Sequence, residues 1–474
     1  MSETETLFAA LRQSADGAVV DVLERMVREA PDHALNRMNP LDLAANAFVG
    51  ERAGVREERV IAALLHAVAL GLMEMTWSVM CPSCAGVLSA NKSLKTLNRA
   101  QYNCAFCAAG YETSLDDLVE VTFTISPRVR KIAAHRPDQL SPAEYYRQVF
   151  WSSAIDLAAD PEKLLRDVTL EIVDLPPGER AILSLQVPKG TVIVFDPVTH
   201  TAQYLDVSGE ATRERQNLSV IFNKVQVPVD TIALRPGPLR LALENRTDDR
   251  VLPAVWVQNQ ALDDLLMRRK PILTAKRLLT NQTFRDLYRT DTLAIGQRLK
   301  ILSLTFLFSD LKDSTALYER VGDLTAFDLV NEHFRLMQEI IASERGAVVK
   351  TIGDAMMATF ETPDRAIAAA IRMREAMSDL GAERQHQSLR LKMGIHEGSC
   401  LAVTLNAQQD YFGQTVNIAS RVQGLAASRS IVVTESVVEN AHARALLETS
   451  GLKPTRRSVA LSGIADKVSI YEIS

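Results

Sequence analysis

The chain has 474 residues, more than one compact hydrophobic core usually holds, so we expect several domains. Hydrophobic residues make up 47% and charged residues 23% of the sequence, values that are typical of globular proteins and exclude a disordered or fibrous chain. The net charge of −5 does not favour a general nucleic-acid-binding or membrane-surface role.

Residues 1–75 have helical periodicity and show no targeting signal. The acidic start MSETETLFAA lacks the basic region of a signal peptide. The longest apolar run, from Val60 to Met73, is shorter than the roughly 20 residues that a membrane-spanning helix needs. We therefore predict a cytoplasmic protein without a membrane segment, whose first 75 residues are helical. The strand-like residues 75–80 that follow also permit a winged-helix-like unit.

Four of the five cysteines form two CxxC pairs, with nineteen residues between the pairs: Cys81, Cys84, Cys104 and Cys107. Each pair presents two thiolates from one turn, and two pairs complete a tetrahedral site with no open position. In a reducing compartment such spacing favours metal over disulfides, with a redox dithiol as the alternative. We predict a zinc ribbon over residues 76–125 that holds one structural Zn²⁺. The fifth cysteine, Cys400, is interpreted as a small buried residue.

Residues 126–300 show three successive patterns. Residues 126–167 are predicted to form a helical connector. From 168 to 258, short runs with period 2 are separated by turn signals such as Pro176-Pro177-Gly178, which predicts a central β-sandwich. Residues 259–300 return to helical spacing and are predicted to be a helical linker. No titratable cluster in the sandwich suggests catalysis, and the sequence identifies no regulatory ligand or partner for this region.

The last segment, residues 301–474, alternates strands and helices. We expect strands at 303–308, 347–352, 355–360, 389–395, 399–405, 431–434, 458–461 and 468–473, and helices at 324–343, 363–380 and after Gly413. Crossovers mixed with hairpins are typical of a ferredoxin-like α/β sandwich. The predicted fold class is therefore multi-domain α+β.

Four short stretches of this segment carry residues suited to nucleotide chemistry: 308–315, 350–354, 410–413 and 417–421. Asp310 ends an apolar strand, and Asp354 follows a glycine turn. Asn417 and Arg421 are four residues apart and lie on one helix face. In this order and spacing, the stretches resemble the catalytic domain of the class III adenylate and guanylate cyclases, from Leu304 to the end of the sequence.

The resemblance implies two Mg²⁺ or Mn²⁺ ions, a purine-reading pair and two residues for the ribose and the transition state. The residues implied are Asp310, Asp354 and the Leu311 carbonyl for the metals, Lys350 and Asp410 for the base, Asn417 for the ribose, and Arg421 for the transition-state charge. It also implies a homodimer with two shared sites, in which one chain supplies the metal ligands and its partner the other residues. Asp313 departs from the family pattern, which commonly has glycine there, and this puts catalytic efficiency in doubt.

The chemistry of these side chains agrees with the implied roles. Carboxylate oxygens suit hard divalent cations, and a pair of cations suits an attack by the ribose 3′-hydroxyl on the α-phosphorus. The planar guanidinium of Arg421 can bind phosphoryl oxygens through two hydrogen bonds. Lys350 only donates and Asp410 only accepts, which complements N1 and the N6 amine of adenine, whereas guanine would turn donors toward Lys350.

We therefore predict an adenylate cyclase that converts ATP into cyclic AMP and pyrophosphate, with a guanylate cyclase as the alternative. A nucleic-acid-binding regulator with an inactive cyclase-like sensor domain is the alternative from another class of protein. The complete set of metal- and base-reading residues argues against inactivity. The sequence also lacks a P-loop, a dinucleotide-binding motif and a zinc-protease motif.

Overall fold

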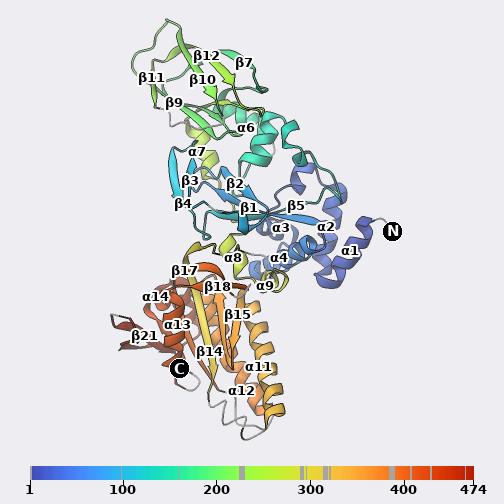
Figure 1. The fold of residues 1–474 in the computed structure, drawn as a ribbon, viewed down its shortest axis with the longest axis vertical. Helices are drawn as coiled ribbons and strands as arrows, with labels where there is room; N and C mark the ends of the chain where they lie inside the picture. Colours follow the sequence, from blue (N-terminus) through green and yellow to red (C-terminus); the bar gives the residue numbers. More distant parts are fainter. Residues whose placement is uncertain are drawn as a thin grey trace. The chain divides into compact units, whose positions relative to one another are not determined.

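The computed structural model describes residues 3–97, 99–157, 160–223, 230–288, 293–294, 296–312, 319, 322–383, 390–405, 408–427, 430–464 and 466–473. The chain forms two compact units (Figure 1). The first comprises Met1–Ser93, Arg99–Thr113 and Asp117–Leu273, and the second comprises Leu94–Asn98, Ser114–Asp116 and Thr274–Ser474. The finer division into six segments stays a prediction. Within the described ranges, every helix is too short or too polar to cross a membrane.

The first unit opens with four α-helices: α1 (Glu3–Ser14), α2 (Gly17–Glu29), α3 (Pro40–Ala47) and α4 (Ala53–Ala69). Side chains cap two of them. The Asp16 carboxylate accepts hydrogen bonds from backbone N–H groups of α2, and Asn39 does the same for α3, which has proline at its first position. Residues 3–69 are thus largely helical, as the periodicity predicts. The winged-helix-like arrangement stays a prediction.

Two small sheets follow. A three-stranded sheet has the order β2-β1-β5, and β3 pairs with β4 in a hairpin. The strands are β1 (Met73–Met80), β2 (Val87–Asn91), β3 (Gln101–Cys104), β4 (Ala109–Glu112) and β5 (Val119–Ile125). Short helical segments surround and follow them: η1 (Asp32–Leu35), η2 (Leu94–Thr96), η3 (Ala133–His135), η4 (Pro137–Gln139), α5 (Pro142–Tyr145), η5 (Tyr146–Phe150) and α6 (Pro161–Val168).

The rest of the first unit has two further sheets, with strand orders β10-β12-β7 and β11-β9-β8-β13-β6. Apolar residues of both sheets contribute to one core, which includes Val194 of β8 and Leu241 of β12. The elements are β6 (Thr169–Ile172), β7 (Arg180–Val187), β8 (Gly190–Asp196), β9 (Thr201–Val207), β10 (Gln216–Phe222), β11 (Ile232–Leu234), β12 (Gly237–Asn245), β13 (Ala254–Val257) and α7 (Gln260–Met267). The strand β11 was not expected, because its three residues are too few to show a period.

The second unit is built on one mixed sheet with the order β15-β16-β14-β17-β19-β21-β20, and β18 pairs with β17. Helices α11, α12, α14 and α15 share a core with the sheet, and α13 packs against β17 and β14. The elements are α8 (Ala275–Leu279), α9 (Gln282–Leu287), β14 (Leu299–Leu311), α11 (Asp323–Ser343), β15 (Gly346–Ile352), β16 (Ala355–Phe360), α12 (Pro363–Glu383), β17 (Leu391–Leu405), β18 (Gln408–Phe412), α13 (Gln414–Gly424), β19 (Ile431–Thr434), α14 (Glu435–Glu439), α15 (Ala441–Thr449), β20 (Thr455–Val459) and β21 (Val468–Ile473).

The prediction of two strands at 389–395 and 399–405 is wrong, because β17 runs unbroken from Leu391 to Leu405. Gly398, which lies between the two predicted strands, does not make a turn. A Cβ atom on Gly394 would lie 2.2 Å from the backbone nitrogen of Gln423, so glycine here lets α13 approach the strand. The first strand of the unit, β14, is also longer than expected and contains an irregularity between Ile301 and Leu304.

Candidate active site and metal centre

The first element of the site is the end of strand β14. Its apolar residues, such as Phe306 and Leu307, are completely buried in the sheet, which fixes the strand up to Asp310. The neighbouring strand β16 begins just after a tight turn at Gly353, whose φ of 63° suits glycine. The register pairs Ser309 with Met356, and this brings Asp310 and Asp354 to the same end of the strand pair.

The two carboxylates influence each other. Burial, and secondly the Asp354 carboxylate, raise the pKa of Asp310, while Lys392 and a hydrogen bond from Gln423 oppose the rise. The Oδ2 atom of Asp354 is buried, and it has no hydrogen-bond partner within the described residues. An unpartnered carboxylate oxygen beside a second carboxylate fits a hard divalent cation, because a cation would relieve both the repulsion and the missing contact. Leu311, whose carbonyl is the third predicted ligand, is buried at the end of the same strand.

The second element is the pair Lys350 and Asp410, which are sixty positions apart in the sequence and in direct contact. The Lys350 Nζ atom lies 2.5 Å from the Asp410 Oδ2 atom. The other carboxylate oxygen of Asp410 accepts a hydrogen bond of 2.8 Å from the backbone nitrogen of Tyr411. Asp410 is 7% exposed, whereas the Lys350 side chain is 41% exposed. Asp410 is therefore held in place by the protein, whereas Lys350 is accessible to a ligand.

The third element is helix α13, which carries Asn417 and Arg421. Asn417 is exposed, and Arg421 is half-buried with its guanidinium close to Gly463. Their spacing of four residues on α13 is the spacing that places two residues on one helix face. Among the described residues, no hydrogen bond or ion pair joins either of them to the acidic pair or to Lys350 and Asp410. The roles of all these residues stay predictions. Asp313 lies outside the described residues.

The four cysteines come together in the first unit. Their sulfur atoms all lie within 4.8 Å of one another. The Cys81 and Cys107 sulfurs are 3.8 Å apart, and those of Cys84 and Cys104 are 3.7 Å apart. A backbone N–H, that of Gly86, donates to the Cys84 sulfur at 3.4 Å.

The two knuckles have the same backbone shape. The residue after the second cysteine is in the left-handed region in both, with φ of 53° at Ala85 and 50° at Ala108. This repeat turns both pairs of thiols toward a common centre. Hydrogen bonding within the cluster, chiefly with Cys104, lowers the pKa of Cys81 and raises that of Cys84. Four soft sulfur ligands in such a cluster fit one tetrahedral Zn²⁺.

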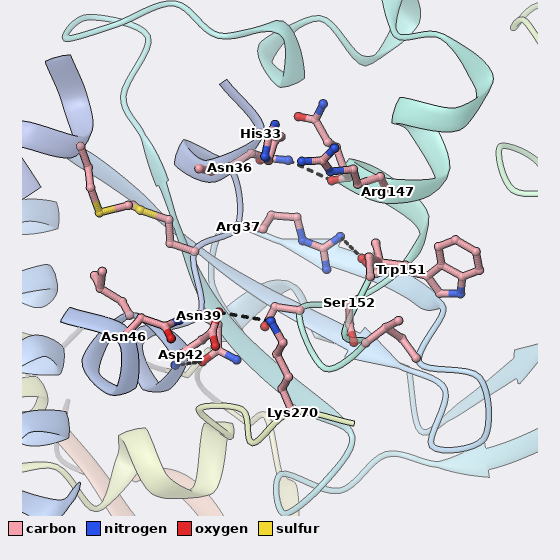
Figure 2. Close-up of a pocket in the computed structure, with 18 residues that line it drawn as sticks. His33, Asn36, Arg37, Asn39, Asp42, Asn46, Arg147, Trp151, Ser152 and Lys270 are labelled. Atoms are coloured by element: carbon pink, nitrogen blue, oxygen red, sulfur yellow. Dashed lines mark hydrogen bonds and ion pairs between the residues drawn. The ribbon is translucent and has the colours of Figure 1, made fainter. Parts of the chain in front are cut away.

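A cavity of about 410 Å³ lies in the first unit (Figure 2). Its walls come from three separate parts of the chain, between residues 26 and 46, between 147 and 157, and at Lys270. Figure 2 shows His33 and Arg147 on one side, Asp42 and Lys270 on the other, and Arg37 between them. Arg37 has a φ of 47°, a conformation that non-glycine residues adopt rarely.

The basic groups of this cavity are balanced by acids. The carboxylate partners are Glu120 for Arg37 at 3.4 Å, Glu144 for Arg147 at 3.5 Å, and Asp156 and Asp42 for Lys270 at 2.9 and 3.4 Å. Each of these three basic side chains therefore has at least one carboxylate partner within the protein. The sequence does not predict this cavity, because its lining residues follow no motif or spacing.

Two families match the chain. Residues 1–286 match a family described as a family of unknown function, DUF5939, and residues 299–473 match the adenylate and guanylate cyclase catalytic domain. An adenylate cyclase from Anabaena cylindrica is 31% identical over 185 residues, which cover 36% of this chain and 36% of that protein. Adenylate cyclase 2 from Rhizobium meliloti is 31% identical over 132 residues, which cover 25% of this chain and 36% of that protein. The chain thus spans only about 36% of the length of these two curated relatives.

Solved structures also show similarity to part of the chain. The adenylyl cyclase CyaB from P. aeruginosa is 23% identical with a TM-score of 0.34, over 38% of this chain and 96% of that one. The guanylyl cyclase Cya2 is 21% identical with a TM-score of 0.34, over 38% of this chain and 94% of that one. The resemblance seen in the four motifs is confirmed by the family match. The chain belongs to the DUF5939 family through residues 1–286, and it carries an adenylate and guanylate cyclase catalytic domain in residues 299–473.

Proposed function

We propose that the second unit converts ATP into 3′,5′-cyclic AMP and pyrophosphate. The observation that carries this proposal is the contact between Lys350 and Asp410, whose Nζ and Oδ2 atoms are 2.5 Å apart. Both adenylyl and guanylyl cyclases occur among the similar structures, so the choice of nucleotide rests on the chemistry of this pair.

The pair favours adenine because its donor and acceptor match one edge of that base. Lys350 donates to the N1 acceptor, and Asp410 accepts from the N6 amine. Guanine presents N–H donors where Lys350 also donates, which leaves donors without acceptors. Sites built around such hydrogen bonds discriminate by up to about 10⁴–10⁵. The hydrogen bond from the Tyr411 nitrogen keeps Asp410 in place when the base separates it from Lys350.

The acidic pair would hold the divalent cations. The unpartnered Oδ2 atom of Asp354 and the carboxylate of Asp310, with the Leu311 carbonyl at the end of the same strand, offer the oxygen ligands that Mg²⁺ or Mn²⁺ prefers. When bound, such ions lower the pKa of an attacking hydroxyl and neutralise the leaving pyrophosphate. The protein's own contribution is to fix both carboxylates beside the ends of buried strands.

The remaining residues act on the ribose and the phosphates. Asn417 orients the ribose so that its 3′-hydroxyl points at the α-phosphorus, and Arg421 binds the charge that develops on the phosphoryl oxygens. We propose that two copies of the chain share each site, with Asp310 and Asp354 from one copy and Lys350, Asp410, Asn417 and Arg421 from the other. Isologous pairing of this kind produces two equal sites.

The first unit has a different proposed role. Its four-cysteine cluster binds one Zn²⁺ and is structural, because four protein ligands leave no position for water or substrate. The DUF5939 region as a whole regulates the cyclase domain.

The test is to incubate the purified full chain with ATP and Mn²⁺ or Mg²⁺ and to identify the product by mass. We expect cyclic AMP and pyrophosphate in equal amounts. The Lys350→Glu variant, which replaces the donor with an acceptor, should lose about 100-fold or more in kcat/KM for ATP while keeping its fold. Absence of any cyclic nucleotide from the wild-type protein would exclude this function, and unchanged ATP kinetics in the variant would remove Lys350 from the base site.

A further inference from the structure

The segment just before the catalytic domain, residues 274–286, is part of the DUF5939 match and also part of the second compact unit. By sequence, α8 and most of α9 fall inside the DUF5939 match, which ends at residue 286. By contacts, they belong to the second unit, whose main segment begins at Thr274. The last residues of the DUF5939 family are therefore structural parts of the cyclase unit, and Figure 1 shows α9 near the labelled ends of β15 and β18.

Arg285 of α9 is buried in this unit. It is 9% exposed, and its guanidinium donates three hydrogen bonds to main-chain carbonyls. The Nε atom donates to Val348 at 3.1 Å, and the Nη2 atom donates to Val349 at 3.3 Å and to Gln409 at 3.0 Å. No carboxylate in the described part of the chain forms an ion pair with Arg285.

The positions of these carbonyls are specific. The Val349 carbonyl belongs to the peptide group that joins Val349 to Lys350, and the Gln409 carbonyl belongs to the peptide group that joins Gln409 to Asp410. One guanidinium thus fixes the two peptide planes that lead into the two residues of the proposed base-reading pair. A peptide plane sets the direction of the next side chain, so Arg285 fixes where Lys350 and Asp410 point.

Strand β15 needs this support because it is irregular just before Lys350. Its register pairs Val348 with Ala358 and Lys350 with Met357, so Val349 is an extra residue opposite a regular strand. Such bulges redirect the following side chain and leave backbone groups without ladder partners. β15 is also the edge strand of the sheet, so no second strand holds the bulge.

Other residues of the same segment contact the same two strands. The Gln282 Oε1 atom accepts a hydrogen bond from the Val348 nitrogen at 2.8 Å. The Tyr411 hydroxyl, one residue after Asp410, donates to the Leu279 carbonyl at 3.3 Å. The Arg285 guanidinium also lies 6.0 Å from the centre of the Tyr411 ring. The segment therefore contacts both strands around the pair through two side chains, Arg285 and Gln282, and one main-chain carbonyl, that of Leu279.

We propose that Arg285 is a positioning residue for purine selection, supplied to the catalytic domain by the DUF5939 region. It contacts no substrate itself. Burying a guanidinium without a carboxylate partner is costly, and stability alone does not call for it. Any movement of α9 changes the distance and direction between Lys350 and Asp410. Through this helix, the DUF5939 region therefore controls which nucleotide the catalytic domain uses. This inference rests on the proposed function of the pair.

The test compares Arg285→Met, Arg285→Lys and a matched control, Arg277→Met, in the full chain. Arg277 is also 9% exposed and lies on the preceding helix α8, where its Nε atom is 4.0 Å from Glu361. The measurements are KM and kcat for ATP and for GTP with Mn²⁺, and the thermal midpoint. In Arg285→Met we expect KM for ATP to rise about tenfold or more and the ATP-to-GTP ratio of kcat/KM to fall by about the same factor, since small misplacements of binding groups have effects of this size.

The expected pattern separates positioning from stability. In Arg285→Met, kcat for ATP should change less than KM, because the pair contacts the base rather than the reacting phosphate. Arg285→Lys, which keeps one donor, should lie between Arg285→Met and the wild type. Arg277→Met should lower the midpoint and leave the ATP-to-GTP ratio unchanged. If Arg285→Met does not fold, Gln282→Leu, which removes the bond to the Val348 nitrogen, should give a smaller shift of the same ratio.

A wild-type ratio in Arg285→Met, or an equal loss of ratio in Arg277→Met, would overturn the positioning role while the proposed function stands. A wild-type protein that forms no cyclic nucleotide from either substrate would overturn both.

Discussion

The four-cysteine cluster of the first unit and the carboxylate pair of the second unit differ in how complete a set of metal ligands each one offers. The four cysteine sulfurs lie within 4.8 Å of one another and fill all positions of a tetrahedral metal. Asp310 and Asp354 offer few ligands, and the Oδ2 atom of Asp354 has no hydrogen-bond partner in the described residues. A complete set of ligands stabilises a fold, whereas an incomplete set leaves room for substrate.

The same contrast applies to the two units as wholes. In the first unit, four cysteine sulfurs form a cluster that could hold one metal ion, and the basic side chains that line the cavity have carboxylate partners. In the second unit, the buried Oδ2 atom of Asp354 has no hydrogen-bond partner among the described residues, and we propose that a nucleotide and its ions bind there. The following predictions test this difference, beginning with the largest expected effect.

The first prediction concerns the incomplete pair. Asp310→Ala and Asp354→Ala should each lower kcat for ATP by at least about 1,000-fold, because removing a single group that stabilises transition-state charge already costs 10²–10³. The thermal midpoint should change little, since a repulsive carboxylate is lost from the apo protein. Turnover and melting curves of the same preparations provide the measurement. Substantial activity in both variants would contradict the metal assignment.

The second prediction concerns the complete cluster, where the effect should fall on stability. Cys104→Ser should lose the single zinc ion per chain. The loss should lower the free energy of unfolding of the first unit by about 4 kcal/mol if free zinc is near 1,000 times its Kd, and the unfolding midpoint should fall with it. Trp77, Trp151 and Trp256 all belong to that unit, so tryptophan fluorescence reports its unfolding. Cys400→Ser, in β17, is the matched control and should keep the zinc. A cluster that contains no zinc by elemental analysis would contradict the assignment.

The third prediction separates a site within one chain from a site shared by two. Mixed Asp310→Ala and Arg421→Ala proteins, each inactive alone, should recover about a quarter of wild-type turnover, because random pairing makes half of the dimers mixed and each of these has one intact site. Zinc content should be the same in all mixtures, since the thiolate cluster lies in one chain. Recovery is measured after the subunits have exchanged. No recovery in a protein that is shown to exchange would exclude the shared site.

The smallest expected effect is on the pH dependence of the second unit. Burial lowers the pKa of His396 to about 4 from an ordinary value of 6.5. Between pH 6.5 and pH 4, His396 is therefore protonated in the unfolded chain but not in the folded chain. As a result, the free energy of unfolding decreases as the pH falls through this range, by up to about 3 kcal/mol from this residue. His396→Gln should reduce the difference between the midpoints at pH 7 and pH 4.5. Equal differences in the two proteins would show that the pKa of His396 is the same in the folded and the unfolded chain, contrary to this account.

The motifs of the site could be predicted from the sequence because the substrate dictates their chemistry. A triphosphate with two cations requires carboxylates, so Asp310 and Asp354 are recognisable at strand ends, and the cysteine spacing identifies a metal cluster in the same way. The contact between Lys350 and Asp410 follows from the fold and agrees with the predicted pairing. Most strands of the second unit also follow from their apolar runs.

Other features could not be predicted, because their partners are main-chain groups or close approaches. Arg285 binds carbonyl oxygens, and any sequence supplies those. Gly394 lies inside a strand in both the prediction and the structure, but the sequence does not reveal that α13 leaves no space there for a side chain. Gln423, which donates a hydrogen bond to Asp310, is an ordinary helix residue by its spacing. Such contacts depend on tertiary packing, which local patterns do not contain.

The most direct test of the central claim is a competition between the two nucleotides. The full chain is given equal concentrations of ATP and GTP with Mn²⁺, and both cyclic products are counted by mass spectrometry in one reaction. If the lysine–aspartate contact selects the base, cyclic AMP should exceed cyclic GMP by about 100-fold or more. Equal amounts of the two products, or an excess of cyclic GMP, would contradict the account.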